Sequence, residues 1–397
     1  MPKDMLMLLA FLLFQIANAS TIRKASNATL VKRQFSGAVF PLKLVAGRVG
    51  IEVINTMTQP NSDLFPQKMR MLVAGHCRKS VYFSNPSDGD RPTVTLELGL
   101  RKMHSEGGFI MKGSIASQRA PRMLQPGDPH GLFCVKSTNI PQNPFTELMH
   151  PFRTKVISFW FSTLEVSSNI DIPTIGEFSV GSLNEDRIDV GPRVRFPLLP
   201  LQVDPANMPN EWLTQTGVEI LVGGRAVYDV PCYLTFDFEY IGLYLPKQVY
   251  NEVVKGLQLE KHQAIAESLD FIPNDLVTQV QDHLRTNRMR RFDCKDVNKI
   301  PDLQFGDLRI SRNMLYVAKR NGKCQLTFEA VRTDEDEICY AAFGTSILRH
   351  WHFSVDFSVP GSEVAMFAPR KVGVDVEQNV DPSCFSKLRN LGECSVN

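Results

Sequence analysis

The stretch that decides the fold is AFGTSILRHWHFSVDFSVPGSEVAMFAP, residues 342–369. It consists of short apolar runs that Gly, Pro and Asp interrupt, and the same pattern begins near residue 44. Runs rich in Val, Ile and Phe between turn-forming residues are typical of β-strands. We expect strands at Val45–Ile54, Thr93–Leu100, Val156–Phe161 and Gly217–Val222. Strands and turns that alternate without a βαβ rhythm predict an all-β fold with sandwich or barrel lobes.

Helical patterns are fewer. The segment Pro246–Leu257 begins with proline at a first helical position and repeats valine on one face, at Val249 and Val253. Asn274–Leu284 forms a second helical pattern that Asn274 can cap. A chain of 397 residues exceeds what one hydrophobic core usually supports, so its length favours two domains.

The N-terminal residues predict export. Lys3 precedes the apolar run Met5–Phe14, and small residues follow up to Ala19, as in a signal peptide over residues 1–19. The run is too short for a membrane span, and no second run of its length follows. We expect a secreted, extracellular protein with no membrane span, in which residues 20–43 form a basic leader or short pro-segment. Asn27 lies in a glycosylation acceptor triplet.

Charge and cysteine content fit that interpretation. The chain has 44 basic and 42 acidic residues, a net charge of +2, which gives no electrostatic footprint for nucleic acid. It has eight cysteines, an even number. In an exported protein such a set indicates disulfides rather than free thiols.

Residues 44–369 resemble the pepsin-like aspartic proteases. In that family an apolar-apolar-glycine strand leads into a short helix ending in Leu-Arg, and then into a hairpin that closes on Ala-Pro, as in residues 342–369. Further matching segments are Gly176–Gly181, Trp212 with Gly217–Ile220, and Tyr244–Pro246. The resemblance implies a bilobal all-β fold with two six-stranded-barrel-type lobes and a central cleft. The lobes would span residues 44–190 and 191–369, followed by a Cys-containing tail over residues 370–397.

The family's chemistry needs two carboxylates that share one proton and activate one water. Each belongs to an Asp-Thr/Ser-Gly loop. The second loop aligns on residues 236–240, where Asp237 is kept but bulky or acidic residues replace the small ones. The first loop aligns on residues 72–76, where Val73 stands in place of the aspartate. The resemblance therefore implies a cleft with these residues: Val73, Gly75, His76, Leu98 (in place of the flap tyrosine), Phe238, Glu239 and Tyr240.

Valine cannot take or give a proton, so the sequence predicts that Asp237 is a residual, non-functional member of the pair. General acid–base groups contribute about 10²–10⁴-fold each. Two other groups of residues are weaker candidates for a functional site. His76 and Cys77 are sequence neighbours, which on a strand point to opposite faces. His350 and His352 have one-face spacing but are only two potential zinc ligands. We expect neither a metal nor a cofactor.

The resemblance also implies disulfides. The spacing of Cys294 and Cys324 is that of the family's second-lobe disulfide. The other cysteines would pair as Cys77–Cys134, Cys232–Cys339 and Cys384–Cys394, although sequence alone leaves that connectivity open.

Together these features predict a secreted pepsin-fold protein, inactive as a protease, that binds a peptide, protein or other ligand in its cleft and is a monomer. Two alternatives stay open. One is a divergent aspartic endopeptidase that uses Asp237, and the other is a structural or storage protein.

Overall fold

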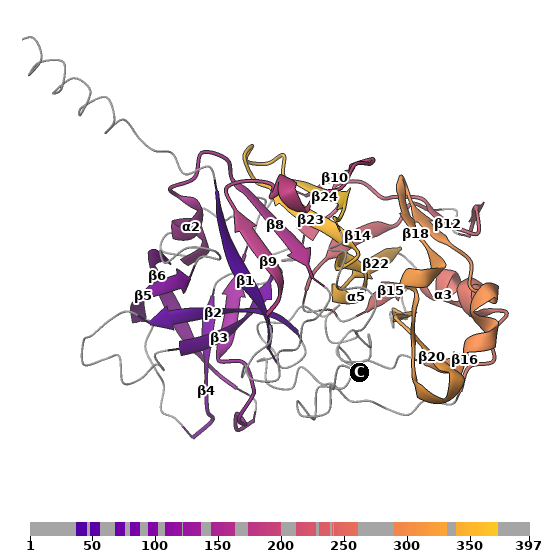
Figure 1. Cartoon of the computed structure of the whole chain (residues 1–397), viewed down its shortest axis with the longest axis horizontal. Coiled ribbons are helices and arrows are strands. Elements are labelled where there is room, and N and C mark those ends of the chain that lie inside the picture. The colour runs from indigo at the N-terminus through magenta and orange to yellow at the C-terminus, as the bar shows by residue number, and fades with distance from the viewer. Residues whose placement is uncertain are drawn as a thin grey trace, which may run out of the picture.

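The structure, a computed structural model, describes residues 37–45, 48–55, 68–75, 80–87, 94–101, 108–120, 122–135, 144–162, 174–199, 212–227, 230–238, 240, 242–260, 290–331 and 339–371. Strands dominate these residues, which confirms the all-β prediction (Figure 1). None of the helices in the described ranges is long and apolar enough to cross a membrane.

The largest sheet has twelve strands and joins both ends of the described chain. In order across the sheet they are β10 (Val194–Pro197), β24 (Val364–Pro369), β23 (Trp351–Asp356), β8 (Val156–Phe161), β9 (Thr174–Val180), β1 (Ala38–Val45), β2 (Arg48–Asn55), β3 (Lys68–Ala74), β7 (Gly131–Cys134), β4 (Val81–Ser84), β6 (Gly108–Arg119) and β5 (Val94–Arg101). Strand β2 also pairs with β5. In Figure 1 the yellow strands β23 and β24 accordingly lie beside the magenta strands β8 and β9.

Three smaller sheets come from the second half of the chain. One contains β11 (Trp212–Leu213), β14 (Tyr233–Phe236), β22 (Tyr340–Phe343), β15 (Leu243–Leu245) and β21 (Phe328–Ala330). Another contains β13 (Arg225–Ala226), β12 (Ile220–Val222), β17 (Leu303–Phe305) and β18 (Leu308–Ile310). The third contains β16 (Arg291–Asp293), β20 (Lys323–Leu326) and β19 (Tyr316–Ala318).

The helices of the described residues are short. Among these residues the α-helices are α2 (Pro144–Met149), α3 (Lys247–Val254) and α5 (Thr345–Leu348), and the 3-10 helices are η2 (Glu185–Arg187), η4 (Cys294–Lys299), η5 (Arg312–Met314) and η6 (Arg320–Gly322). Helix α3 follows Pro246 and buries Val249 and Val253, as predicted from the apolar face. The second predicted helix, Asn274–Leu284, lies outside the described residues.

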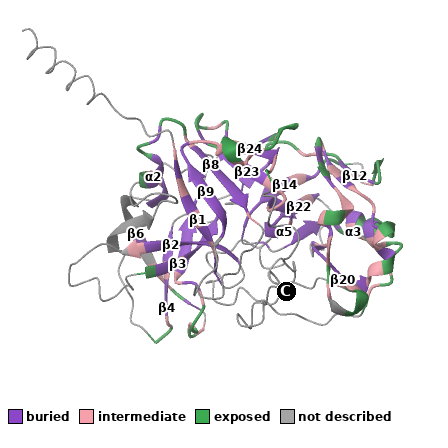
Figure 2. Cartoon of the chain, viewed as in Figure 1, coloured by how far each residue is buried: buried purple, intermediate pink, exposed green. Residues whose placement is uncertain are grey.

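The alternation of side chains along the strands explains where the core lies. Phe159, Phe178 and Phe353 occupy matching positions on neighbouring strands and face the main hydrophobic core. The ring centroids of Phe159 and Phe178 are 5.1 Å apart. Figure 2 shows the buried positions running along β1, β8, β9 and β23. Successive side chains of a strand point to opposite faces, so the serines next to these phenylalanines lie on the other face of the same strands. They are Ser158, Ser179 and Ser354.

The predicted strands mostly hold, with one correction. Val156–Phe161 is β8, Thr93–Leu100 corresponds to β5, and Gly217–Val222 shortens to β12. Val45–Ile54 is not one strand, because the chain reverses after Val45 and the partner of Val45 across the hairpin is Arg48. An apolar run alone does not reveal a two-residue reversal.

The twelve-stranded sheet runs across the predicted segment boundaries. Strand β1 begins at Ala38, so residues 38–43, which the sequence analysis placed in a basic leader or short pro-segment, lie in this sheet. The twelve-stranded sheet also crosses the predicted lobe boundary at residue 190, because β10, β23 and β24 pair with each other and with β8. The predicted signal peptide, the glycosylation site at Asn27 and the tail beyond Lys371 lie outside the described residues.

Candidate functional site

Two groups of strands have the same connectivity. In the first, β3 runs parallel to β7, β7 antiparallel to β4, and β4 parallel to β6. In the second, β14 runs parallel to β22, β22 antiparallel to β15, and β15 parallel to β21. In both groups a late strand, β7 or β22, is inserted between two strands that one loop connects. These two loops contain the residues at which the sequence analysis placed the catalytic pair.

Strand register shows which residues of the two loops correspond. Phe236 and Leu243 both lie opposite Phe343 of β22. Val73 lies opposite Phe133 of β7, and the register Val81↔Leu132 puts residue 80, one position earlier, at the level of Phe133. Both segments therefore span eight residues, from 73 to 80 and from 236 to 243. Val73 corresponds to Phe236, and the counterpart of Asp237 is the next residue, Ala74.

Burial supports this correspondence. Val73 and Phe236 both belong to the main hydrophobic core, as do the two central phenylalanines Phe133 and Phe343. Ala74 belongs instead to a small separate cluster with Leu72, Val81, Leu132 and Cys134. In the second group the equivalent side holds a cluster of Tyr240, Tyr244, Val331 and Ala342. The side chains at 74 and 237 thus leave their strands on the same side.

The predicted pairing of Val73 with Asp237 is corrected by one residue. The sequence-based correspondence placed Gly75 at the motif glycine and therefore Val73 at the position of the first aspartate. The chemical conclusion survives the correction, because alanine, like valine, has no group that can share a proton. The signal that sequence reasoning missed is the equal loop span, which depends on knowing which central-strand residues pair.

The Asp237 side chain lies in the protein interior, with 0% of its surface exposed. Its backbone N–H donates to the Phe343 carbonyl over 3.0 Å. The Thr345 hydroxyl donates to the Phe238 carbonyl over 3.0 Å, and the Thr345 N–H donates to the Tyr240 carbonyl over 2.7 Å. The loop is therefore fixed by the first turn of α5.

Glycine is required at Gly344, which directly follows β22 and precedes the first residue of α5. A Cβ there would collide with the carbonyl oxygens of Tyr240 and Gly242, so the loop and the strand can approach only without a side chain. The equivalent position in the first group is Cys134, which is fully buried and disulfide-bonded. The two loops are thus stabilised by different means.

The residues after Ala74 and Asp237 also differ in size. A Cβ at Gly75 would lie 3.1 Å from the ring of Trp212, so the indole packs directly on the backbone of the first loop. Phe238 is 1% exposed, and its ring centroid lies 4.3 Å from that of Phe159. Trp212 and Phe238 both contact Phe353 of β23, with centroid separations of 6.0 and 5.8 Å. Both loops therefore rest on one aromatic cluster.

The remaining predicted cleft residues are only partly described. His76 and Glu239 lie outside the described residues. Leu98 is in β5, where it pairs with Asn55 of β2 and Met111 of β6, so it belongs to the β5–β6 hairpin. Tyr240 is 3% exposed and packs against Tyr244, with centroids 5.9 Å apart.

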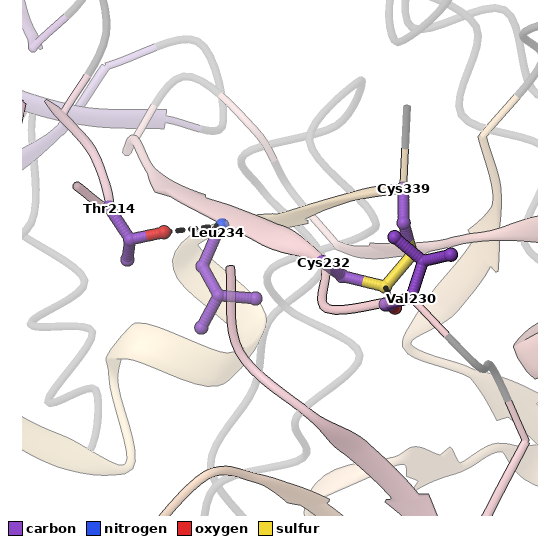
Figure 3. The surroundings of a disulfide bond; sticks show 5 residues. All are labelled: Thr214, Val230, Cys232, Leu234 and Cys339. Atoms are coloured by element: carbon purple, nitrogen blue, oxygen red, sulfur yellow. Dashed lines mark hydrogen bonds between the residues drawn. A yellow bond between two sulfur atoms is a disulfide. The ribbon is translucent and has the colours of Figure 1, made fainter. Parts of the chain in front are cut away.

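Two disulfides lie in the described second half. Cys232 and Cys339 join the starts of the parallel strands β14 and β22, with Cα atoms 4.4 Å apart (Figure 3). Beside this bond the Leu234 N–H donates to the Thr214 hydroxyl over 3.0 Å. Cys294 and Cys324 are joined across the β16–β20 pair, with Cα atoms 5.0 Å apart. These are two of the four pairings that the sequence analysis expected, whereas Cys77, Cys384 and Cys394 lie outside the described residues.

The histidine pair does not form a metal centre within the described residues. His352 is in β23 with 0% of its surface exposed, and His350 lies between α5 and β23. The described part of the chain contains no group of three or more His, Cys, Asp and Glu side chains that could hold a metal ion. His76, next to Cys77, cannot be placed because both lie outside the described residues.

Comparison with known proteins gives no family: no family model matches the chain, and no curated protein matches it. No relative therefore indicates the chemistry of the site, which follows from the residues of this chain. The described part of the second loop holds the buried carboxylate of Asp237. The corresponding position of the first loop is Ala74, whose side chain has no group that can share a proton with a carboxylate.

Proposed function

We propose that this chain is a bilobal, pepsin-like pseudo-protease that is secreted and acts by binding a peptide or another ligand. The observation that carries the proposal is the correspondence of Ala74 with Asp237 in two loops of equal span. One loop keeps the acid that the family's chemistry needs, and the other has lost it. Catalytic loss with retention of the surrounding fold favours binding over hydrolysis.

The proposed fold is supported by the repeated strand connectivity. A strand inserted between two loop-connected strands, once in each half, is the arrangement that the resemblance to pepsin-like proteases leads us to expect. The sheet shared by both halves and the disulfide Cys294–Cys324 also fit that resemblance. Secretion and glycosylation at Asn27 remain part of the proposal, and the disulfides support them because such bonds persist in oxidising compartments.

Loss of hydrolysis is tested with the mature chain, starting near Ser20 and produced by secretion. The purified protein should leave unfolded protein substrates intact between pH 2 and 6, the range in which a carboxylate pair is expected to work. Asp237→Asn is the matched control, since it keeps the size of the side chain. Cleavage that Asp237→Asn abolishes would overturn the proposal in favour of the endopeptidase alternative.

Binding is tested separately, by native mass spectrometry of the same protein with a library of short peptides at pH 7. We expect discrete peptide adducts whose population falls in Tyr240→Ala, which removes a buried side chain of the second loop. Absence of any adduct, with the library or with material that co-purifies, would favour the structural or storage alternative.

A further inference from the structure

The face of the twelve-stranded sheet opposite the main core carries a buried polar layer. Ser179, Ser158 and Ser354 lie in one row across β9, β8 and β23, and each is at most 2% exposed. His352, two residues before Ser354, lies on the same face and has 0% of its surface exposed. Within the described residues neither ring nitrogen of His352 has a hydrogen-bond partner, and the Ser158 hydroxyl also has none.

A segment that leads into β10 lies along the edge of this face. The Asp189 N–H donates to the Pro369 carbonyl, and the Lys371 N–H donates to the Arg187 carbonyl, both over 2.8 Å. Strand β10 then pairs with β24 from Val194↔Phe367 onward. In the order of the twelve-stranded sheet β10 is an edge strand whose neighbour is β24 alone. The backbone of residues 185–197 is therefore paired with β24 and the residues that follow it, and the Arg187 side chain adds contacts with Glu177 of β9 and Trp160 of β8.

Two charges of this segment act on His352. Glu185 and Arg193 form an ion pair of 2.6 Å, and both are close enough to affect the imidazole. Burial lowers the pKa of His352 to about 4, Glu185 opposes this effect, and Arg193 adds to it. The structure, with residues 185–197 paired to β24, is a closed state that suits a neutral His352 imidazole. In this state a protonated imidazole would be shielded from water and close to the guanidinium of Arg193.

Other charged groups on the surrounding elements do not remove this penalty. They are Glu177 of β9, which accepts from Arg187 Nε over 3.0 Å; Arg195 of β10; Asp356 of β23; and Arg370, which donates to the Phe161 carbonyl. Glu177 already has Arg187 as its partner, Asp356 is exposed, and the two arginines are cations. Glu185 is the acid that acts on His352, and it is shared with Arg193.

We propose that His352 is an acid-sensitive latch, whose protonation loosens residues 185–197, including edge strand β10, from β24. The direction follows from linkage. In the closed state the pKa of His352 is about 4, and in an open, hydrated state it returns toward its ordinary value near 6.5. The open state binds the proton more tightly, so acidification between these values favours opening. The latch is independent of whether the site at Asp237 has lost catalysis.

The proposal is tested by hydrogen–deuterium exchange of the mature protein at pH 7 and pH 5, after correction for intrinsic exchange rates. The two pKa values predict an increase of about 20-fold in the opening equilibrium of the β10 amides over this interval. Amides of β9 serve as the internal reference. His352→Gln removes the titrating group while keeping a polar side chain, so the increase should disappear. His150→Gln is the matched control at an exposed histidine and should leave the increase unchanged.

An equal increase in His352→Gln, or no increase in the unmodified protein, would overturn the latch. Because His352→Gln can fail to fold, a second measurement uses the unmodified protein alone. Exchange of the imidazole C2 hydrogen, followed by mass spectrometry, reports the pKa of His352 directly. A value well below 6.5 supports the latch, and an ordinary value contradicts it.

Discussion

Gly75 packs its backbone against the indole of Trp212, such that a Cβ at residue 75 would lie 3.1 Å from the ring. The indole is fully buried and belongs to a sheet of the second half of the chain, so it has little freedom to move away. The first loop therefore packs tightly against the second half of the chain at this contact.

Gly75→Ala should destabilise the protein by about 1–3 kcal/mol, because overpacking a tight contact forces its surroundings to shift. Urea unfolding at pH 7 measures the change. Trp212→Phe makes room at the ring, so in the double variant the cost of Gly75→Ala should shrink by at least about 0.5 kcal/mol. Strictly additive costs would contradict the direct contact.

The correspondence of Ala74 with Asp237 predicts how new carboxylates behave. Ala74→Asp should be destabilised partly by repulsion from Asp237, and Asp237→Asn should recover part of that loss, at least about 1 kcal/mol. Val73→Asp instead places an acid in the main core, and we expect a loss of roughly 3 kcal/mol or more that Asp237→Asn does not relieve. Double-mutant cycles in urea compare the two. If Asp237→Asn instead recovered stability in Val73→Asp and not in Ala74→Asp, Val73 would be the counterpart of Asp237, as the sequence predicted. Neither single variant should gain proteolysis, because no hydroxyls link the loops at residues 75 and 238.

The ion pair of Arg187 with Glu177 predicts a large effect from one substitution. Glu177 is 3% exposed and accepts hydrogen bonds from Arg187 and Asn184, and the Arg187 guanidinium lies 4.2 Å from the Trp160 ring centroid. Arg187→Ala leaves a buried carboxylate with fewer donors and should cost about 2–4 kcal/mol. Lys255→Ala is the control, since it breaks an exposed pair with Glu252 and should cost below about 0.5 kcal/mol. Equal costs for the two variants would argue against the buried pair.

His350 predicts loss of stability in acid. Burial lowers the pKa of His350 to about 3, and the neighbouring cations Arg349 and Arg370 contribute. Because the folded pKa is below the ordinary value near 6.5, the unfolded chain binds the proton more tightly, and stability falls as the pH drops from about 6.5 toward 3. The free energy of unfolding should decrease by about 1–2 kcal/mol more between pH 7 and 4.5 in the unmodified protein than in His350→Gln. His150→Gln should leave that slope unchanged, and identical slopes in all three proteins would contradict the prediction.

The cysteines outside the described residues give a further test. Peptide mapping without reduction should recover Cys232–Cys339 and Cys294–Cys324, the two disulfides of the second half. Cys134 is disulfide-bonded, and we expect Cys77 as its partner, which leaves Cys384 with Cys394. A Cys134–Cys384 linkage would show that the tail is attached to the first loop and would contradict the predicted pairing.

Particular residues show how far the sequence could lead. Val156–Phe161 and the α3 face at Val249 and Val253 were predictable, because their periodicity is local. The pairing of Ala74 with Cys134 was not, because register between strands 60 residues apart depends on tertiary contacts. The burial of Phe238 could not be predicted either. It depends on an aromatic cluster to which segments far apart in the sequence contribute, among them Trp212, which packs on Gly75.

The twelve-stranded sheet has a consequence for how the chain folds. Strand β8 pairs with β23, nearly two hundred residues later, and β10 pairs with β24 near the C-terminal end of the described chain. Contacts of such long sequence separation slow folding, because loop closure precedes the gain from pairing. During synthesis the free edge of β8 must therefore wait for the end of the chain to emerge. Until then the nascent protein exposes an apolar strand edge, and its yield should depend on chaperones that shield that edge.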